Sequence, residues 1–96
     1  LSLEQLMNSV CENPVKIFGI KNKGFIKEGY DADFTIVDMN KVIEIKNDKI
    51  ESKCSWSPFH GYKLKGTPVS TIIAGEIKMR EGIIIGKPSG LPMEFI

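Results

Sequence analysis

Glycines interrupt the chain at short intervals from residue 24 onward, and the runs between them are rich in β-branched side chains. Short β-branched runs bounded by turn-forming residues are typical of strands joined by tight connections, so we expect an all-β unit here. Ala74-Gly75-Glu76 and Glu81-Gly82 each fit a tight hairpin connection, which predicts a meander across residues 69–85. The expected strands are residues 33–37, 42–45, 69–74, 77–80 and 83–85.

The first eleven residues have the pattern of an amphipathic helix. Ser2 can cap the amino end, and Gln5 three positions later completes a capping box. Four apolar side chains recur at helical spacing and form one stripe: Leu3, Leu6, Met7 and Val10. An exposed apolar stripe marks contact with another surface, so we expect this helix to pack against something.

A second, shorter helix is expected directly after the first. Asn13 can cap it, and Pro14 suits a first turn, where the N–H that proline lacks has no partner in any case. Gly19 is expected to end this helix.

The segment of residues 50–68 has no strand periodicity but contains Trp56, Phe59 and Tyr62. We therefore expect a long loop whose aromatic rings pack onto a neighbouring surface. Residues 87–92 contain two prolines and should be extended and irregular.

Size and charge exclude several classes of protein. Ninety-six residues form one small domain at most. With 13 Lys and Arg against 12 Asp and Glu, the net charge of +1 gives no electrostatic reason to expect nucleic acid or a membrane surface as a partner. No apolar run approaches the roughly 20 residues that span a bilayer, and no signal peptide is recognisable.

The two cysteines, Cys11 and Cys54, lie far apart in the sequence, and neither belongs to a C-x-x-C pair. Lone cysteines of this kind are typical of reduced, partly buried thiols in the cytoplasm. We therefore expect a cytoplasmic protein without a disulfide bond.

The chain offers few side chains for chemistry. A metal site needs several His, Cys, Asp or Glu groups at one point, and the single histidine, His60, has no adjacent partner for base catalysis. Asp31 and Asp33 would share one face of an extended segment, where a cation site is conceivable. Carboxylates that precede a strand more often bond to their own backbone, so we favour a structural role for this pair.

The remaining candidates are also weak. Ser55 and Ser57 flank Trp56, but no histidine relay or G-x-S-x-G turn accompanies them, so a nucleophile is not expected. Trp56, Phe59 and Tyr62 would need a basic groove to bind nucleic acid, and none accompanies them. The chain is therefore predicted to have no catalytic residue, no cofactor-binding residue and no metal ligand.

The order of motifs resembles the cyclic amidohydrolases, a family of metal-dependent hydrolases. Residues 13–20 resemble the Asn-Pro-Ala to Phe-Gly-Leu segment that follows the barrel in this family, and residues 24–38 resemble its Gly-x-Asp-Ala-Asp segment with the strand that follows. Residues 52–69, which contain Ser-Pro-Phe-His-Gly-Tyr, resemble a run of the dihydroorotases, where dihydropyrimidinases and allantoinases tend to differ. Residues 71–77 resemble the family's hairpin.

This resemblance covers nearly the whole chain and implies a fold class that is mainly β with an N-terminal helix. Residues 1–23 would be the last helix of a (β/α)8 barrel, and residues 24–96 the C-terminal half of a composite β-sandwich. The full enzyme would reversibly cyclise N-carbamoyl-L-aspartate to L-dihydroorotate in pyrimidine biosynthesis. Its zinc would be held by barrel histidines, a carboxylated lysine and an aspartate ahead of the matched segment, so this chain alone is expected to be inactive and free of zinc.

The expected partner is the remainder of such an enzyme, its barrel and amino-terminal strands. Isolated from them, the chain should associate with itself through its uncovered apolar faces. Two alternatives stay open: a non-catalytic module that docks on an active amidohydrolase subunit, and the same domain of a dihydropyrimidinase or allantoinase. Neither nucleic acid nor a membrane is expected as a partner.

Overall fold

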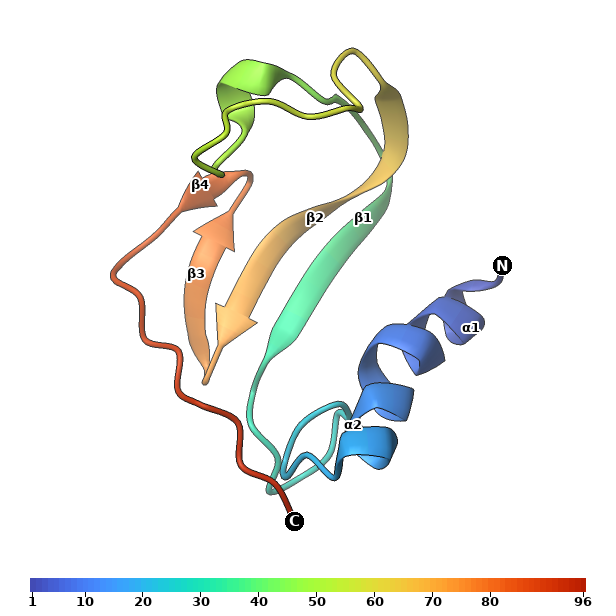
Figure 1. Ribbon diagram of the computed structural model, residues 1–96, viewed down its shortest axis with the longest axis vertical. Coiled ribbons are helices and arrows are strands. Elements are labelled where there is room, and N and C mark those ends of the chain that lie inside the picture. Colours follow the sequence, from blue (N-terminus) through green and yellow to red (C-terminus); the bar gives the residue numbers. More distant parts are fainter.

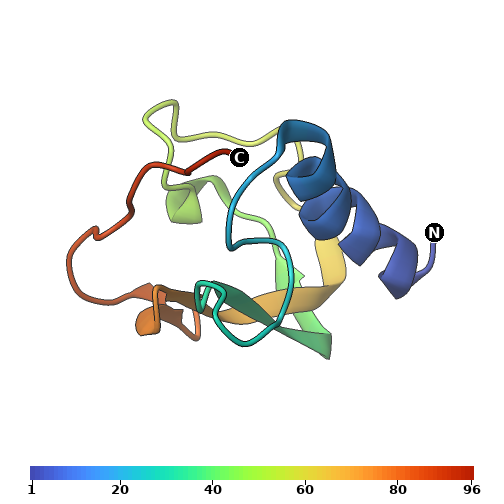
Figure 2. The same ribbon diagram turned by 90° about the horizontal axis from the view of Figure 1, so that it is seen from below.

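The computed structural model describes residues 1–96 as a helical arm, a four-stranded antiparallel sheet and an extended C-terminal tail (Figure 1). The sheet has the strand order β1-β2-β3-β4, so each strand pairs with its neighbour in sequence. Figure 2 shows the arm, the loop between β1 and β2 and the end of the tail on one side of the sheet. The architecture is therefore mainly β with one N-terminal helical segment.

The helical arm comprises α1 (Leu3–Met7), the π-helical turn η1 (Asn8–Glu12) and α2 (Asn13–Phe18). The predicted capping box is confirmed, since the Gln5 N–H donates to Ser2 Oγ (3.1 Å) and the Ser2 N–H donates to Gln5 Oε1 (2.8 Å). Gly19 ends the arm in the left-handed region (φ 62°), also as predicted. No helix of the chain is long and apolar enough to cross a membrane.

The predicted helix start at Asn13 is confirmed, because α2 begins there, but the predicted role of Asn13 as its cap is wrong. Asn13 has helical dihedrals (φ −63°, ψ −44°), makes no side-chain cap, and donates its N–H to the carbonyl oxygen of Asn8, five residues back. A proline inside an α-helix collides with the carbonyl four residues earlier, and the wider π turn that leads into Pro14 makes room for its ring. The two predicted helices, α1 and α2, are therefore both present, and η1 joins them into one continuous arm.

The strands are β1 (Phe34–Glu44), β2 (Lys63–Ile73), β3 (Glu76–Arg80) and β4 (Ile83–Ile84). The two predicted strands at residues 33–37 and 42–45 form one strand, β1, whose residues 39–41 bulge out opposite Gly66. Asp38 stabilises this bulge, because its Oδ1 accepts the N–H groups of Asn40 (2.9 Å) and Lys41 (3.2 Å). The predicted meander across residues 69–85 is confirmed.

The loop predicted at residues 50–68 ends earlier than expected, because β2 begins at Lys63. Pro68 obscures this strand in the sequence, since proline lacks the N–H that a central strand needs. Here Pro68 lies beside a register shift in the β1–β2 ladder, and β3 pairs with β2 only from Ser70 onward. The missing donor therefore leaves no ladder bond unmade on the β3 side.

Both predicted hairpin turns are present. Ala74 (φ 50°) and Gly75 (φ 80°) join β2 to β3, and Glu81 (φ 51°) and Gly82 (φ 79°) join β3 to β4. Two successive positive φ angles are the mark of the hairpin turn whose twist matches that of the strands.

The fold lacks an interior core. Only Thr67 is buried, and no hydrophobic side chain is. The helical elements contact no strand, so the sheet and the arm do not cover one another. The Cα radius of gyration is 15.2 Å, whereas a compact domain of this length has about 12.5 Å. The helices and strands therefore form an extended arrangement that encloses no hydrophobic core.

Candidate functional site

The carboxylate pair ahead of β1 is joined by a lysine of the same chain. Lys23 Nζ lies 2.6 Å from Asp33 Oδ2 and 3.0 Å from Asp31 Oδ2. Asp33 also accepts the backbone N–H of Ala74 at 2.9 Å through Oδ1. These contacts give the pair a structural role, as the sequence favoured, and both oxygens of Asp33 have a partner within the chain.

The charges of this cluster shift its proton equilibria. The hydrogen bond from Lys23, followed by that from the Ala74 N–H, lowers the pKa of Asp33 below its ordinary value of 3.8. The hydrogen bonds to Asp33 and Asp31 raise the pKa of Lys23 above 10.5. Both shifts favour the charged forms, so the cluster is an ion pair with no group poised to exchange a proton near neutral pH.

His60 fixes the loop between β1 and β2. Its Nδ1 accepts the backbone N–H of Asn47 at 2.9 Å, and the Asn47 side chain in turn accepts the Ser57 N–H at 2.9 Å. Because a backbone N–H can only donate, Nδ1 carries no proton in this arrangement. The loop neck closes where Ile45 exchanges hydrogen bonds with Gly61 and Tyr62. His60 therefore has a structural partner, as the sequence suggested.

The loop aromatics do not pack as predicted. Trp56 is 58% exposed, and Phe59 and Tyr62 contact each other edge to face (5.7 Å between ring centroids) while both remain more than half exposed. No surface of this chain covers them. The prediction that these rings pack onto a neighbouring surface is therefore wrong for the surfaces that this chain itself provides.

The serines and cysteines form no reaction centre. Ser57 Oγ accepts the Phe59 N–H (3.1 Å), and Ser55 has no side-chain partner, so neither serine is next to a base. Cys11 and Cys54 are free thiols, and both are exposed, which corrects the expectation that they are partly buried. Hydrogen bonding with the Trp56 backbone, followed by that with the Ser52 side chain, lowers the pKa of the Cys54 thiol.

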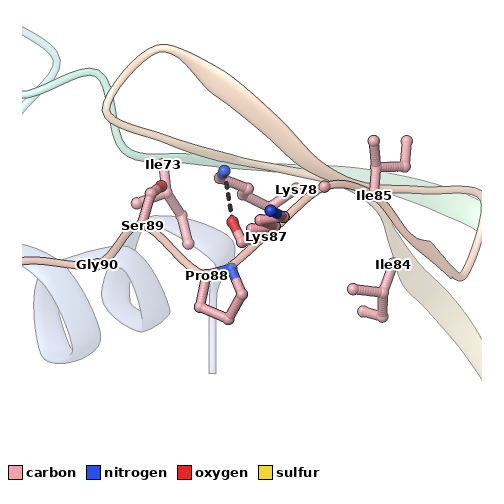
Figure 3. A pocket seen from close by; sticks show the side chains of 9 residues that line it. Ile73, Lys78, Ile84, Ile85, Lys87, Pro88, Ser89 and Gly90 are labelled. Carbon is pink, nitrogen blue, oxygen red and sulfur yellow. Dashed lines mark hydrogen bonds between the residues drawn. The ribbon is translucent and has the colours of Figure 1, made fainter.

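The two best-defined hollows of the surface differ in size. The larger, about 640 Å³, lies against β1 and the β3–β4 turn. Four of its charged groups form two ion pairs, with Lys41 Nζ 2.9 Å from Glu81 Oε2 and Lys46 Nζ 3.9 Å from Glu44 Oε2. The smaller, about 200 Å³, lies between Ile73, Ile84, Ile85 and the tail (Figure 3). Neither hollow combines an acid, a base and a nucleophile.

No three His, Cys, Asp or Glu side chains gather where they could hold a metal ion. Sequence reasoning missed three residues that organise the structure: Lys23, Asn47 and Lys78. Each acts across ten or so residues through a single side chain, and no periodic pattern marks such a contact.

The most extensive feature of the surface is apolar. The predicted helical stripe of Leu3, Leu6, Met7 and Val10 is exposed along its whole length. The chain exposes 7940 Å² in total, about 2,400 Å² more than a compact protein of its mass. This surplus area is as large as a permanent protein–protein interface. The exposed apolar surface, which includes the helical stripe, is therefore the candidate functional surface of the chain.

The family model and the curated relatives that this chain matches point to the same family. Residues 1–78 match the model of the Amidohydrolase family. The chain is 49% identical over 90 residues to the dihydroorotase of Pyrococcus furiosus, covering 94% of this chain and 22% of that protein. It is 39% identical over 95 residues to the dihydroorotase of Methanothermobacter thermautotrophicus, covering 98% of this chain and again 22% of the relative.

Solved structures show the same fold. The L-hydantoinase (dihydropyrimidinase) of Arthrobacter aurescens superposes with a TM-score of 0.85 at 34% identity, over 91% of this chain and 20% of that one. A D-hydantoinase superposes with a TM-score of 0.82 at 30% identity, over 91% of this chain and 19% of that one. The chain spans about a fifth of the length of the relatives that it matches.

Proposed function

This chain belongs to the amidohydrolase family, and we propose that it is the C-terminal structural domain of a dihydroorotase. In this role residues 1–23 are the last helix of the catalytic barrel, and residues 24–96 are half of a composite β-sandwich. The whole enzyme would reversibly cyclise N-carbamoyl-L-aspartate to L-dihydroorotate in the cytoplasm. The chain described here would supply shape and stability, and the catalytic groups would lie in the rest of the polypeptide.

The observation that carries this proposal is the similarity to dihydroorotases along the whole chain. The identity of 49% over 90 residues to the Pyrococcus furiosus protein extends across arm, sheet and loop. It exceeds the 34% identity to the L-hydantoinase whose fold is so similar. The fold is shared among these relatives, so sequence identity is the better guide to substrate class.

The uncovered surface supports a role that depends on further polypeptide. A surplus exposure of about 2,400 Å² is about three times the roughly 800 Å² that each partner buries in a stable interface of standard size. It fits a domain whose core is completed by other parts of the same protein. The exposed loop aromatics fit as well, because the rest of the enzyme would cover them.

The donor groups of this chain do not fit a zinc ion. Structural and catalytic zinc sites use at least three converging ligands, and no three such side chains of this chain converge. Lys23 pairs with both Asp31 and Asp33, and His60 Nδ1 accepts a backbone N–H. The zinc that the family resemblance implies would therefore be bound elsewhere in the whole enzyme. No step of the reaction is assigned to residues of this chain.

The experiment is complementation in trans. The chain and the remaining part of the enzyme are produced separately, and dihydroorotate formation and bound zinc are measured for each and for the mixture. We expect no activity and no stoichiometric zinc for the chain, and activity that rises when the two are mixed. Leu6→Ser, on the exposed stripe, should weaken this rescue, and Glu4→Ser, on the other side of the helix, should not.

Activity with zinc in the isolated chain would overturn the proposal. Rescue of dihydropyrimidine or hydantoin hydrolysis instead of dihydroorotate formation would assign the chain to the hydantoinase branch, the alternative that the TM-score of 0.85 favours. Rescue of a separate, complete amidohydrolase subunit would instead make the chain a docking module.

A further inference from the structure

The C-terminal tail returns from β4 to the carboxyl end of the helical arm (Figure 1). At its near end, the Ile85 N–H donates to the carbonyl of Lys78 (2.8 Å), and Lys78 Nζ donates to the carbonyl of Lys87 (2.9 Å; Figure 3). The side chain of Lys78 is only 15% exposed and also pairs with Glu76 at 2.8 Å. The near end is therefore attached to β3 by backbone and side chain together.

At its far end, the tail pairs with the chain just after the arm. The Lys21 N–H donates to the carbonyl of Glu94 (2.8 Å), and the Ile96 N–H donates to the carbonyl of Gly19 (2.7 Å). Ile20 and Phe95 form an antiparallel bridge between these two bonds. Residues 88–93 between the two ends make no hydrogen bond within the chain.

The arm has few other attachments. It contacts no strand of the sheet, so its position depends on the segment of residues 19–33 and on the tail. In that segment Gly24 lies against the arm. A Cβ atom at Gly24 would lie only 2.7 Å from the carbonyl oxygen of Cys11. The tail is the second connection, and it reaches the arm from the opposite edge of the sheet.

We propose that the tail, residues 85–96, is a clasp that holds the helical arm in a fixed orientation to the sheet. Pro88 and Pro92 restrict the backbone of the free middle section, so it has little slack to absorb movement of either end. The arm carries the apolar stripe, and the clasp therefore sets the angle at which that stripe is presented. This inference concerns the chain itself and does not depend on the identity of the enzyme.

Hydrogen exchange tests the clasp in the 96-residue chain and in a chain shortened to end at Met93, which loses both far-end bonds. The informative amides are those of Ile20, bonded to Val15, and Asp31, bonded to Asn22, because neither donates to the tail. We expect both to exchange at least about fivefold faster in the shortened chain, the factor that corresponds to loss of one hydrogen bond's net stabilisation. The Glu81 amide, bonded to Val69 within the sheet, should not change.

A second variant tests the near end without shortening the chain. Lys78→Met releases the Lys87 carbonyl and should speed exchange at Ile20 and Asp31 by about twofold, since the free section lengthens only slightly. Lys46→Met removes a lysine that does not touch the tail and serves as the matched control. Unchanged exchange at Ile20 and Asp31 in the shortened chain would overturn the clasp. Equal acceleration at Glu81 would also overturn it, because the tail would then stabilise the whole fold and not the arm.

Discussion

Asp33 accepts a hydrogen bond from the backbone N–H of Ala74, 41 residues further along the chain. This bond joins the segment before β1 to the turn between β2 and β3, and the Gly75 N–H adds a second bond to the carbonyl of Ala32 (3.0 Å). Lys23 neutralises the charge of Asp33 from the other side. The Asp-x-Asp motif is therefore a structural connection between the segment before β1 and the β2–β3 turn.

Two substitutions of Asp33 distinguish the contribution of its ion pair with Lys23 from that of its hydrogen bond with Ala74. Asp33→Asn keeps an oxygen for the Ala74 N–H but loses the ion pair, and should lower the free energy of unfolding by about 0.5 kcal/mol, as expected for a partly exposed pair. Asp33→Ala also leaves the Ala74 N–H without its acceptor and should lower it by about 1.5 kcal/mol. Urea unfolding measures both, and equal losses would show that the Ala74 bond contributes nothing.

The same cluster makes stability depend on pH. Folding lowers the pKa of Asp33 below 3.8, so its contribution is complete at neutral pH and is lost as the pH falls through the folded value. Folding raises the pKa of Lys23 above 10.5, so its contribution is complete below that pH and is lost as the pH rises through the folded value. The stability difference between wild type and Asp33→Asn should therefore be constant between about pH 6 and 9 and shrink below about pH 4.

The sequence predicted local structure better than long-range contacts. The capping box, the stop at Gly19 and both hairpin turns depend on residues close together in the chain, and all are confirmed. The start of β2 was missed because Gly66 and Pro68 interrupt its alternation, and they are tolerated only because of the bulge and register shift in β1 opposite them. That compensation lies more than 25 residues away in the sequence.

The roles of the candidate site residues were predictable where they depend on neighbours in the sequence. Structural roles for Asp31, Asp33 and His60 followed from their local surroundings, and the structure supplies the partners, Lys23, Ala74 and Asn47. The exposure of Trp56 was not predictable. An aromatic ring in a loop indicates that it packs against some surface, but the sequence does not say whether that surface belongs to the same chain.

Gly24 is required by both backbone and space. Its φ of 85° disfavours any other residue, and a Cβ would collide with the Val15 side chain and the Cys11 carbonyl oxygen. Gly24→Ala should lower the free energy of unfolding by about 3 kcal/mol or more. Gly29 has the same backbone conformation (φ 86°) with no atom near its Cβ position, so Gly29→Ala should cost only about 1 kcal/mol. Equal losses would show that the packing of Gly24 on the arm is unimportant.

The bond between His60 and Asn47 should control the neck of the loop. His60→Ala removes the acceptor of the Asn47 N–H and should speed exchange of that amide about fivefold, equivalent to roughly 1 kcal/mol. His60→Asn places an amide oxygen close to the position of Nδ1 and should restore slow exchange. If His60→Asn behaves like His60→Ala, the histidine holds the loop by packing and not through Nδ1.

Trp56 distinguishes the isolated chain from the assembled protein. With the indole 58% exposed, Trp56→Ala should change the unfolding free energy of the chain by no more than about 0.5 kcal/mol. If the remainder of a dihydroorotase covers the loop, the same substitution should destabilise the assembled protein by about 2–4 kcal/mol, as for a buried aromatic side chain. Lys53→Ala, at an exposed charged site of the same loop, is the control and should be small in both. A small effect of Trp56→Ala in the assembled protein would mean that the aromatic loop faces solvent there too, because burial is the only source of the larger value.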